Sequence, residues 1–227
     1  MENDIKRKPV HIFDVDLTVI KKTSALHFIK FALKEKIIKF QQISGLIIEW
    51  INYKLARPDI NFIEKTVKKL EGLEKSELER IADICFEKKL KPNIYKDAAR
   101  LIQNALKNNE KVIFATSSFD FIIKPLERHF GIESSLACRL EYSGGKTTGN
   151  LDGFSFFAGG KKNAARAWME SNNILPQDVY FYSDSYTDIP LLEYCGNPAA
   201  VNPDRILARY AKKHGWKIMR FKNVMGN

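Results

Sequence analysis

Two aspartates that lie two positions apart, Asp14 and Asp16, are the residues of this sequence whose types and spacing best suit catalysis. They follow a short apolar run, PVHIF, and in an extended chain their side chains leave the same face. One carboxylate can then attack an electrophile while the other transfers protons. A D-x-D at the end of a strand is, on its own, more often a turn or a cap. Other residues must therefore decide whether these two aspartates are catalytic.

Three more groups of polar residues stand where predicted strands end or a predicted helix begins. They are Thr116 with Ser117 and Ser118 after a strand, Lys161 at a helix start, and Asp184 with Asp188 after another strand. Each group alone has a common structural explanation, such as a helix cap or surface charge. Ligands of a parallel α/β sheet bind outside the carboxyl ends of its strands. The order of the four segments along the chain therefore predicts one shared site.

The charges of this predicted site call for a cation. Four ionised aspartates and Lys161 carry a net charge of −3, and like charges near 4 Å repel by about 4 kcal/mol at an effective dielectric of about 20. A divalent cation changes this net charge to −1, and a proton on Asp16, which would act as general acid, brings it to zero. Carboxylate and carbonyl oxygens favour a hard ion, which predicts Mg²⁺.

Apolar spacing predicts the elements that position these residues. Residues 9–16 form a short buried strand. Roughly the next 75 residues keep helical spacing, with a stop at Gly72 and a capping box at Ser76 and Glu79, which predicts an inserted bundle of four helices. After Pro92, helices and strands alternate, as in an α/β fold with a parallel sheet. Strands are expected at 111–117, 136–142, 179–184, 199–202 and 216–221, helices at 98–106, 119–130, 161–172, 206–214 and near Ile189, and a hairpin in the Gly-rich segment 144–153.

The composition, 227 residues with 44% hydrophobic and 28% charged, is that of a globular protein and excludes a disordered or collagen-like chain. A net charge of +10 favours anionic partners: phosphorylated metabolites, nucleic acid or an acidic membrane surface. The most apolar stretch, residues 43–51, is about half of the ~20 residues that a membrane span needs and contains Glu49. The start has no apolar signal segment, and the cysteines, Cys85, Cys138 and Cys195, are odd in number. A cytoplasmic protein with reduced thiols and no stable membrane insertion is therefore expected.

The motifs DVDLT (residues 14–18), Thr116, Lys161 and DSYTD (residues 184–188) resemble, in order, the four motifs of the haloacid dehalogenase (HAD) superfamily. The resemblance extends over nearly the whole chain, and the helical insertion is similar to the cap of the phosphoserine-phosphatase-like branch. It implies an α/β fold with a Rossmann-like parallel sheet core in residues 1–20 and 92–227. It also implies an all-helical cap, a four-helix bundle, in residues 21–91 after strand one.

The same resemblance implies the roles of the acidic residues. Asp14 attacks phosphorus and forms an aspartyl-phosphate, and Asp16 protonates the leaving oxygen and later activates water. Asp14, the backbone carbonyl of Asp16, and Asp184 bind Mg²⁺. Asp188 lies behind them and orients Lys161 or a metal-bound water.

The phosphoryl group is held, in the same resemblance, by Thr116 and Lys161. Thr18 and Ser117 join them in the substrate-binding set. Lys162 is the rival of Lys161, which is preferred because its spacing from Thr148-Gly149 fits the family pattern.

The function implied is that of a Mg²⁺-dependent phosphatase that hydrolyses a small phosphorylated metabolite. Phosphoserine phosphatases similar to this branch carry a Glu nine residues after the nucleophile, where this chain has Thr23, which disfavours phosphoserine. The alternatives are a lipid-phosphate phosphatase of the phosphatidylglycerophosphate type and a phosphotransferase. From another class comes a nucleic-acid-binding protein with a vestigial site, but no aromatic-basic interleaving supports it, so no nucleic acid is expected. The substrate and the oligomeric state stay open.

Overall fold

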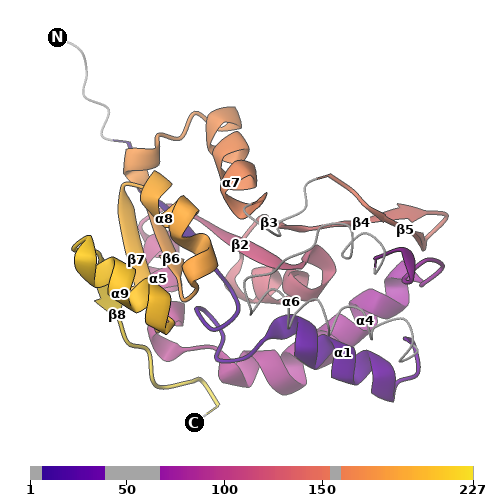
Figure 1. The fold of residues 1–227 in the computed structure, drawn as a ribbon. Helices are drawn as coiled ribbons and strands as arrows, with labels where there is room; N and C mark the ends of the chain where they lie inside the picture. The colour runs from indigo at the N-terminus through magenta and orange to yellow at the C-terminus, as the bar shows by residue number, and fades with distance from the viewer. Residues whose placement is uncertain (1–6, 39–66, 154–159, 227) are drawn as a thin grey trace.

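A six-stranded parallel sheet forms the centre of the molecule (Figure 1). The computed structural model describes residues 7–38, 67–153 and 160–226. The strand order is β3-β2-β1-β6-β7-β8, so successive strands are added on one side of β1 and then on the other. The strands are β1 (Val10–Phe13), β2 (Lys111–Phe119), β3 (Ser135–Cys138), β6 (Val179–Ser183), β7 (Asn197–Val201) and β8 (Lys217–Met219). The direction of winding therefore reverses at the boundary between β1 and β6.

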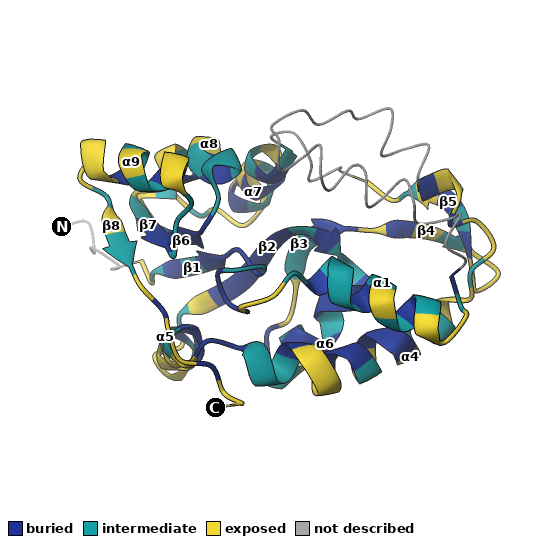
Figure 2. Cartoon of the chain, turned by 60° about the horizontal axis from the view of Figure 1, so that its bottom comes forward, coloured by how far each residue is buried: buried dark blue, intermediate teal, exposed yellow. Residues whose placement is uncertain are grey.

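Helices cover both faces of this sheet because its central strands are apolar on both sides. Ile12 packs in a cluster with residues of α7, α8 and α9, whereas the next residue, Phe13, packs in a second cluster with residues of α5 and α6. Figure 2 shows the buried central strands between helices whose outer sides are exposed. The helices are α5 (Lys96–Lys107), α6 (Asp120–Phe130), α7 (Gly160–Ser171), α8 (Ile189–Tyr194) and α9 (Arg205–Lys213).

The described part of the helical insertion packs beside α6. Its elements are α1 (Ser24–Lys34), α4 (Lys75–Cys85) and the short helices η1 (Phe86–Leu90) and η2 (Lys91–Asn93). Helix α1 contacts α4, both contact α6, and Phe28 of α1 meets Phe121 of α6 edge to face at 5.1 Å between ring centroids. Residues 39–66, which include much of the predicted four-helix bundle and the apolar stretch 43–51, lie outside the described residues. The division into a core and a cap of residues 21–91 stays a prediction.

The start of α4 differs from the predicted capping box. The helix begins at Lys75 with Glu74 as N-cap and with no side-chain cap bond, so Ser76 lies inside the helix rather than at its cap. The Lys75 N–H instead donates to the Gly145 carbonyl at 2.9 Å. A main-chain acceptor from a distant hairpin therefore satisfies the N–H of the first helical residue, one of the N–H groups that have no partner within the helix.

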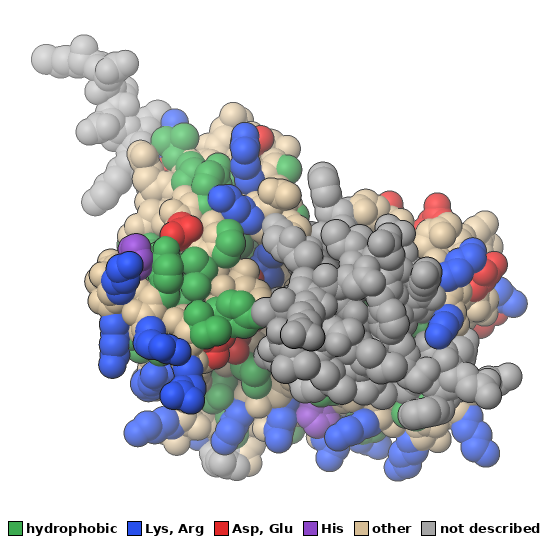
Figure 3. Space-filling view, viewed as in Figure 1, with side chains coloured by type: hydrophobic (Ala, Val, Ile, Leu, Met, Phe, Trp, Pro, Cys, Tyr) green, Lys and Arg blue, Asp and Glu red, His purple; other side chains and the backbone are tan. Residues whose placement is uncertain are grey.

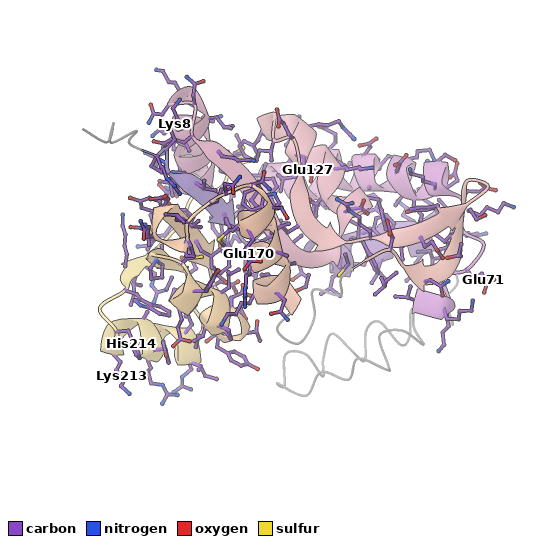
Figure 4. The ribbon with its side chains drawn as sticks, turned by 90° about the horizontal axis from the view of Figure 1, so that it is seen from above. Lys8, Glu71, Glu127, Glu170, Lys213 and His214 are labelled. Carbon is purple, nitrogen blue, oxygen red and sulfur yellow. The ribbon has the colours of Figure 1, made fainter. Side chains whose placement is uncertain are left out.

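The predicted strand over 136–142 is two strands. Residues 135–138 form β3 in the main sheet, and after Arg139 the chain forms β4 (Leu140–Ser143), which pairs antiparallel with β5 (Lys146–Leu151). The hairpin expected in the Gly-rich segment is present. Gly144 and Gly145, at φ 56° and 81°, form its two-residue turn, a conformation that glycine adopts at little cost. Figure 4 shows Glu71 at this end of the molecule and, at the other, Lys213 at the end of α9 with His214 after it.

Two neighbouring boundaries also differ from expectation. Strand β2 continues to Phe119, and α6 begins at Asp120, one residue after the predicted helix start. Phe119 is the last residue of the strand, and its ring stacks on the ring of Phe121 of α6 at 5.7 Å between centroids.

Basic side chains occupy much of the molecular surface, as the net charge of +10 requires. Figure 3 shows Lys and Arg side chains along the lower margin and the left side of the face in view. Within the part of the chain that the structure describes, no helix is long and apolar enough to cross a membrane.

The cysteine thiols are expected to be unreactive in the folded protein. All three are buried thiols outside any disulfide, and burial raises the pKa of Cys85 and of Cys195 to about 12. Because the thiolate is the nucleophile, native protein at pH 8 should react with Ellman's reagent about a thousandfold more slowly than an ordinary thiol. Denaturant should restore three fast thiols. Rapid reaction of a full thiol equivalent in the native protein would contradict this burial.

Candidate active site

The site is built where β1 and β6 end side by side. Phe13 pairs with Tyr182 in parallel register, and the Asp14 N–H donates to the Tyr182 carbonyl at 2.9 Å. Asp14 and Asp184 thus follow adjacent strands, and both are buried. Since the winding reverses between these two strands, their carboxyl ends border the crevice where ligands of open α/β sheets bind.

Lys161 bridges two of the predicted carboxylates. From the first turn of α7, its Nζ donates to Asp14 Oδ1 at 2.8 Å and to Asp188 Oδ2 at 2.7 Å. Lys161 is only 6% exposed, a burial that lysine tolerates when it is paired. Lys162, the rival in the sequence, lies with its Nζ 5.7 Å from the centre of the Tyr194 ring. The geometry therefore brings Lys161, and not Lys162, to Asp14.

The environment of Asp14 works against its ionised form. Burial raises the pKa of Asp14, and the nearby Asp188 carboxylate raises it further, while the positive charge of Lys161 and its hydrogen bond lower it. Lys161 is the counter-charge that keeps this carboxylate able to ionise within the sheet edge. A nucleophilic carboxylate needs that ionised form.

Asp16 lies in the tight turn that follows β1. Leu17 has a φ of 62°, a left-handed conformation that is uncommon outside glycine, and it turns the chain so that Asp16 forms an isolated bridge with Ile20. The Ser24 N–H donates to Asp16 Oδ1 at 2.9 Å. Burial raises the pKa of Asp16 to about 7, and the hydrogen bonds from Ser24 offset part of that rise.

Thr116 lies within β2, the neighbour of β1 in the sheet. Phe13 pairs with Phe114 in parallel register, so the two strands bring Asp14 and Thr116 to the same edge of the sheet. Thr116 is buried, and its Oγ1 accepts a hydrogen bond from the Ser118 N–H at 3.1 Å. Ser117 is partly buried beside it.

Thr18, which belongs to the predicted substrate-binding set, lies against Asp184. It is fully buried, and its hydroxyl donates to Asp184 Oδ1 at 3.4 Å. The main chain of Asp184 is held from the other side, because its carbonyl accepts from the Asp204 N–H at 2.9 Å. In this structure Thr18 thus orients a predicted metal ligand.

The residues present fit a hard divalent cation. Asp14, Asp184 and Asp188 are each buried, and Lys161 pairs with two of these carboxylates, Asp14 and Asp188. Among residues 7–38, 67–153 and 160–226, no group of three or more His, Cys, Asp or Glu side chains is placed to hold a metal ion. The expected set differs from such a group, since it joins two carboxylates to the main-chain carbonyl of Asp16. Oxygen ligands of this kind suit Mg²⁺.

Three serines contribute to the site: Ser118, which the sequence grouped with Thr116, and Ser24 and Ser183, whose contacts the sequence did not reveal. Ser183 donates to Asp188 Oδ2 at 2.6 Å and so helps to hold the partner of Lys161. Ser24 contacts Asp16, and Ser118 contacts both Ser24 and Thr116. The signal available in the sequence was position alone, because each serine stands at a strand end or a helix start beside a motif.

Comparison with known proteins places the chain among hydrolases. The family model for haloacid dehalogenase-like hydrolases matches residues 12–193. The chain is 29% identical over 221 residues to a histidinol-phosphatase of Neisseria meningitidis serogroup C, covering 95% of this chain and 100% of that protein. It is 26% identical over 215 residues to the phosphoserine phosphatase SerB1 of Mycobacterium tuberculosis, covering 92% of this chain and 70% of the other.

Solved structures share the fold at low sequence identity. A protein of unknown function from Bordetella pertussis Tohama I superposes with a TM-score of 0.82 at 23% identity, covering 94% of this chain and 99% of that one. A phosphoserine phosphatase structure with an analogue of the phospho-aspartyl intermediate gives a TM-score of 0.67 at 19% identity, covering 97% and 96%. The predicted α/β fold with a Rossmann-like parallel sheet is thereby confirmed.

Proposed function

The chain belongs to the haloacid dehalogenase-like hydrolase family, and from this membership we propose that it is a Mg²⁺-dependent phosphatase of a small phosphorylated metabolite. The observation that carries the proposal is the buried bridge in which Lys161 joins Asp14 and Asp188 at the carboxyl ends of β1 and β6. The phosphatase names of the relatives from Neisseria and Mycobacterium support the same reaction.

Asp14 is the nucleophile of the first step. One of its carboxylate oxygens attacks phosphorus, and the bond from phosphorus to the ester oxygen breaks as the aspartyl-phosphate forms. Asp16 gives its proton to the departing oxygen, which takes the electron pair of the broken bond. Lys161 and Thr116 hold the phosphoryl oxygens, whose charge a positioned cation and hydroxyl stabilise.

Asp16 is the base of the second step. Having lost its proton, it accepts one from a water that attacks the phosphorus of the aspartyl-phosphate, so that phosphate leaves and the Asp14 carboxylate is restored. Asp14, the Asp16 carbonyl and Asp184 would hold Mg²⁺, which supplies positive charge to the phosphoryl oxygens when it is bound. Asp188, fixed by Ser183, keeps Lys161 directed at Asp14.

The substrate is a phosphomonoester whose leaving group meets the segment of residues 21–91. In this proposal that segment is the cap, and α1 and α4 are its described helices. Thr23 is the N-cap residue of α1 and makes no side-chain cap bond. A neutral threonine does not provide the carboxylate that pairs with an ammonium group, so we expect phosphoserine to be a poor substrate.

The proposal is tested with a panel of phosphomonoesters in Mg²⁺ and in EDTA. Histidinol phosphate, phosphoserine and other soluble phosphometabolites are compared with detergent-dispersed phosphatidylglycerophosphate. We expect phosphate release from a soluble ester, loss of at least about a hundredfold in EDTA, and recovery when Mg²⁺ is added back. Equal phosphate release in EDTA and in Mg²⁺ would contradict a requirement for the metal ion. Turnover confined to the dispersed lipid would favour a lipid-phosphate phosphatase.

A further inference from the structure

We infer that Ser24 and Ser118 form a positioning pair that holds the Asp16 carboxylate in register with Thr116. The inference rests on the proposed function, because it takes Asp16 as the proton donor. It concerns a bond between the first residue of α1 and the end of β2, two segments that are far apart in the sequence.

A continuous chain of hydrogen bonds joins the proton donor to the phosphoryl-binding threonine. The Ser24 N–H donates to Asp16 Oδ1 at 2.9 Å, and the Ser24 hydroxyl donates to Ser118 Oγ at 3.0 Å. The Ser118 N–H in turn donates to Thr116 Oγ1 at 3.1 Å. Ser24 has no exposed surface and Ser118 is 7% exposed, so both hydroxyls depend on protein partners.

The start of α1 takes its position from this pair. Its N-cap, Thr23, makes no side-chain cap bond, so the first turn is not fixed by a cap of its own. The bond to Ser118 instead ties the first helical residue to β2. The N–H that meets Asp16 belongs to that same residue, so the place of Ser24 determines the place of the donor.

Ser24 holds the Asp16 carboxyl group at the point where it acts. The Ser24 N–H donates to Oδ1, and in the proposed reaction the carboxyl group gives its proton to the ester oxygen as the bond from that oxygen to phosphorus breaks. Catalytic proton transfer requires hydrogen-bond distance, and small displacements of an aligned group lower the rate steeply. Loss of the Ser24–Ser118 bond should therefore impair the proton-dependent step while the nucleophile, Lys161 and Thr116 stay in place.

The experiment separates esters by how much they need that proton. Ser24→Ala, Ser118→Ala and the double variant are assayed with the most active alkyl phosphate of the panel and with p-nitrophenyl phosphate, whose leaving group departs without protonation. The parameter compared is kcat/KM, because it reports the steps up to the first product release and excludes the later hydrolysis that both esters share. We expect each single variant to lose about tenfold with the alkyl ester and less than about twofold with the aryl ester.

The double variant and two controls decide whether the pair acts through its bond. If the hydroxyls act through each other, the double variant loses no more than the worse single variant. Ser118→Thr keeps a hydroxyl on a strand and should retain the wild-type ratio between the two esters. Ser135→Ala removes a partly buried hydroxyl that bonds Glu127, outside this chain of bonds, and should leave both values within about twofold.

Three results would overturn the inference: equal losses with both esters, no loss in either single variant, or losses that multiply in the double variant. Thermal unfolding of every variant shows that the compared proteins are folded. If one of the two single variants does not fold, the other still tests the inference. Failure of the proposed function is recognised separately, since wild-type protein would then release no phosphate, or would release it undiminished in Asp14→Asn.

Discussion

Replacing Asp14 by Asn is expected to abolish phosphate release, with kcat at least about a thousandfold below that of the wild type. The amide keeps the size and position of the side chain but has no charge and is a poor nucleophile toward phosphorus. Because Lys161 retains its bond to Asp188 at 2.7 Å, the rest of the site should persist. Release is measured in Mg²⁺ with the best ester of the panel.

The fold of this variant provides its control. Asp14 is a buried carboxylate whose pKa is raised by burial and by Asp188, so its neutral replacement removes a repulsion inside the site. We expect the unfolding temperature of Asp14→Asn to stay at or above that of the wild type. Asp14→Ala should be equally inactive and excludes slow conversion of Asn to Asp. Undiminished release in either variant would refute Asp14 as the nucleophile.

The sequence identified the fold because its main elements have strong local signals. The apolar runs that became β1, β2 and β6 are buried on both faces, and the stripes of α5, α6 and α9 have helical spacing. The strand order then placed Asp14 and Asp184 after the adjacent strands β1 and β6, and Thr116 in the neighbouring strand β2. For residues whose position follows from strand order, sequence spacing was sufficient.

The parts that the sequence did not reveal depend on contacts between distant segments. Helix α4 starts where the Gly145 carbonyl accepts the Lys75 N–H, and a capping pattern at Ser76 cannot indicate such a partner. The segment predicted as one strand is divided at Arg139 because β3 pairs with β2, whereas β4 pairs with β5. A propensity describes one segment, whereas pairing depends on two.

The same limit explains why the bond between Ser24 and Ser118 was not predicted, although Ser118 itself had been grouped with Thr116. The bond between Ser24 and Ser118 joins residues 94 positions apart, and each of them alone resembles an ordinary helix start or strand end. The charged residues were easier to identify, because several buried carboxylates need a cation close to them. Chemistry that rests on charge was therefore predictable from composition and order, and chemistry that rests on main-chain donors was not.

Replacing Lys161 by Ala should damage both activity and stability, which sets it apart from every neighbouring lysine. Its removal leaves the buried carboxylates of Asp14 and Asp188 facing each other without their shared cation. Breaking a buried ion pair from one side costs about 3–5 kcal/mol of unfolding free energy. The loss of phosphoryl charge stabilisation should lower kcat by about a hundredfold or more.

Lys162→Ala is the matched control, because Lys162 occupies the next position of the same helix. Its ammonium lies over the Tyr194 ring, a contact worth about 0.5–1 kcal/mol, and kcat should change by less than about twofold. Lys161→Arg should not rescue, since a planar guanidinium cannot take the place of a compact ammonium held at 2.8 and 2.7 Å between two carboxylates. Denaturant unfolding and steady-state phosphate release measure the two effects. If Lys162→Ala lost activity and Lys161→Ala kept it, the phosphoryl-binding lysine would be the neighbour, and the bridge between Asp14 and Asp188 would be only structural.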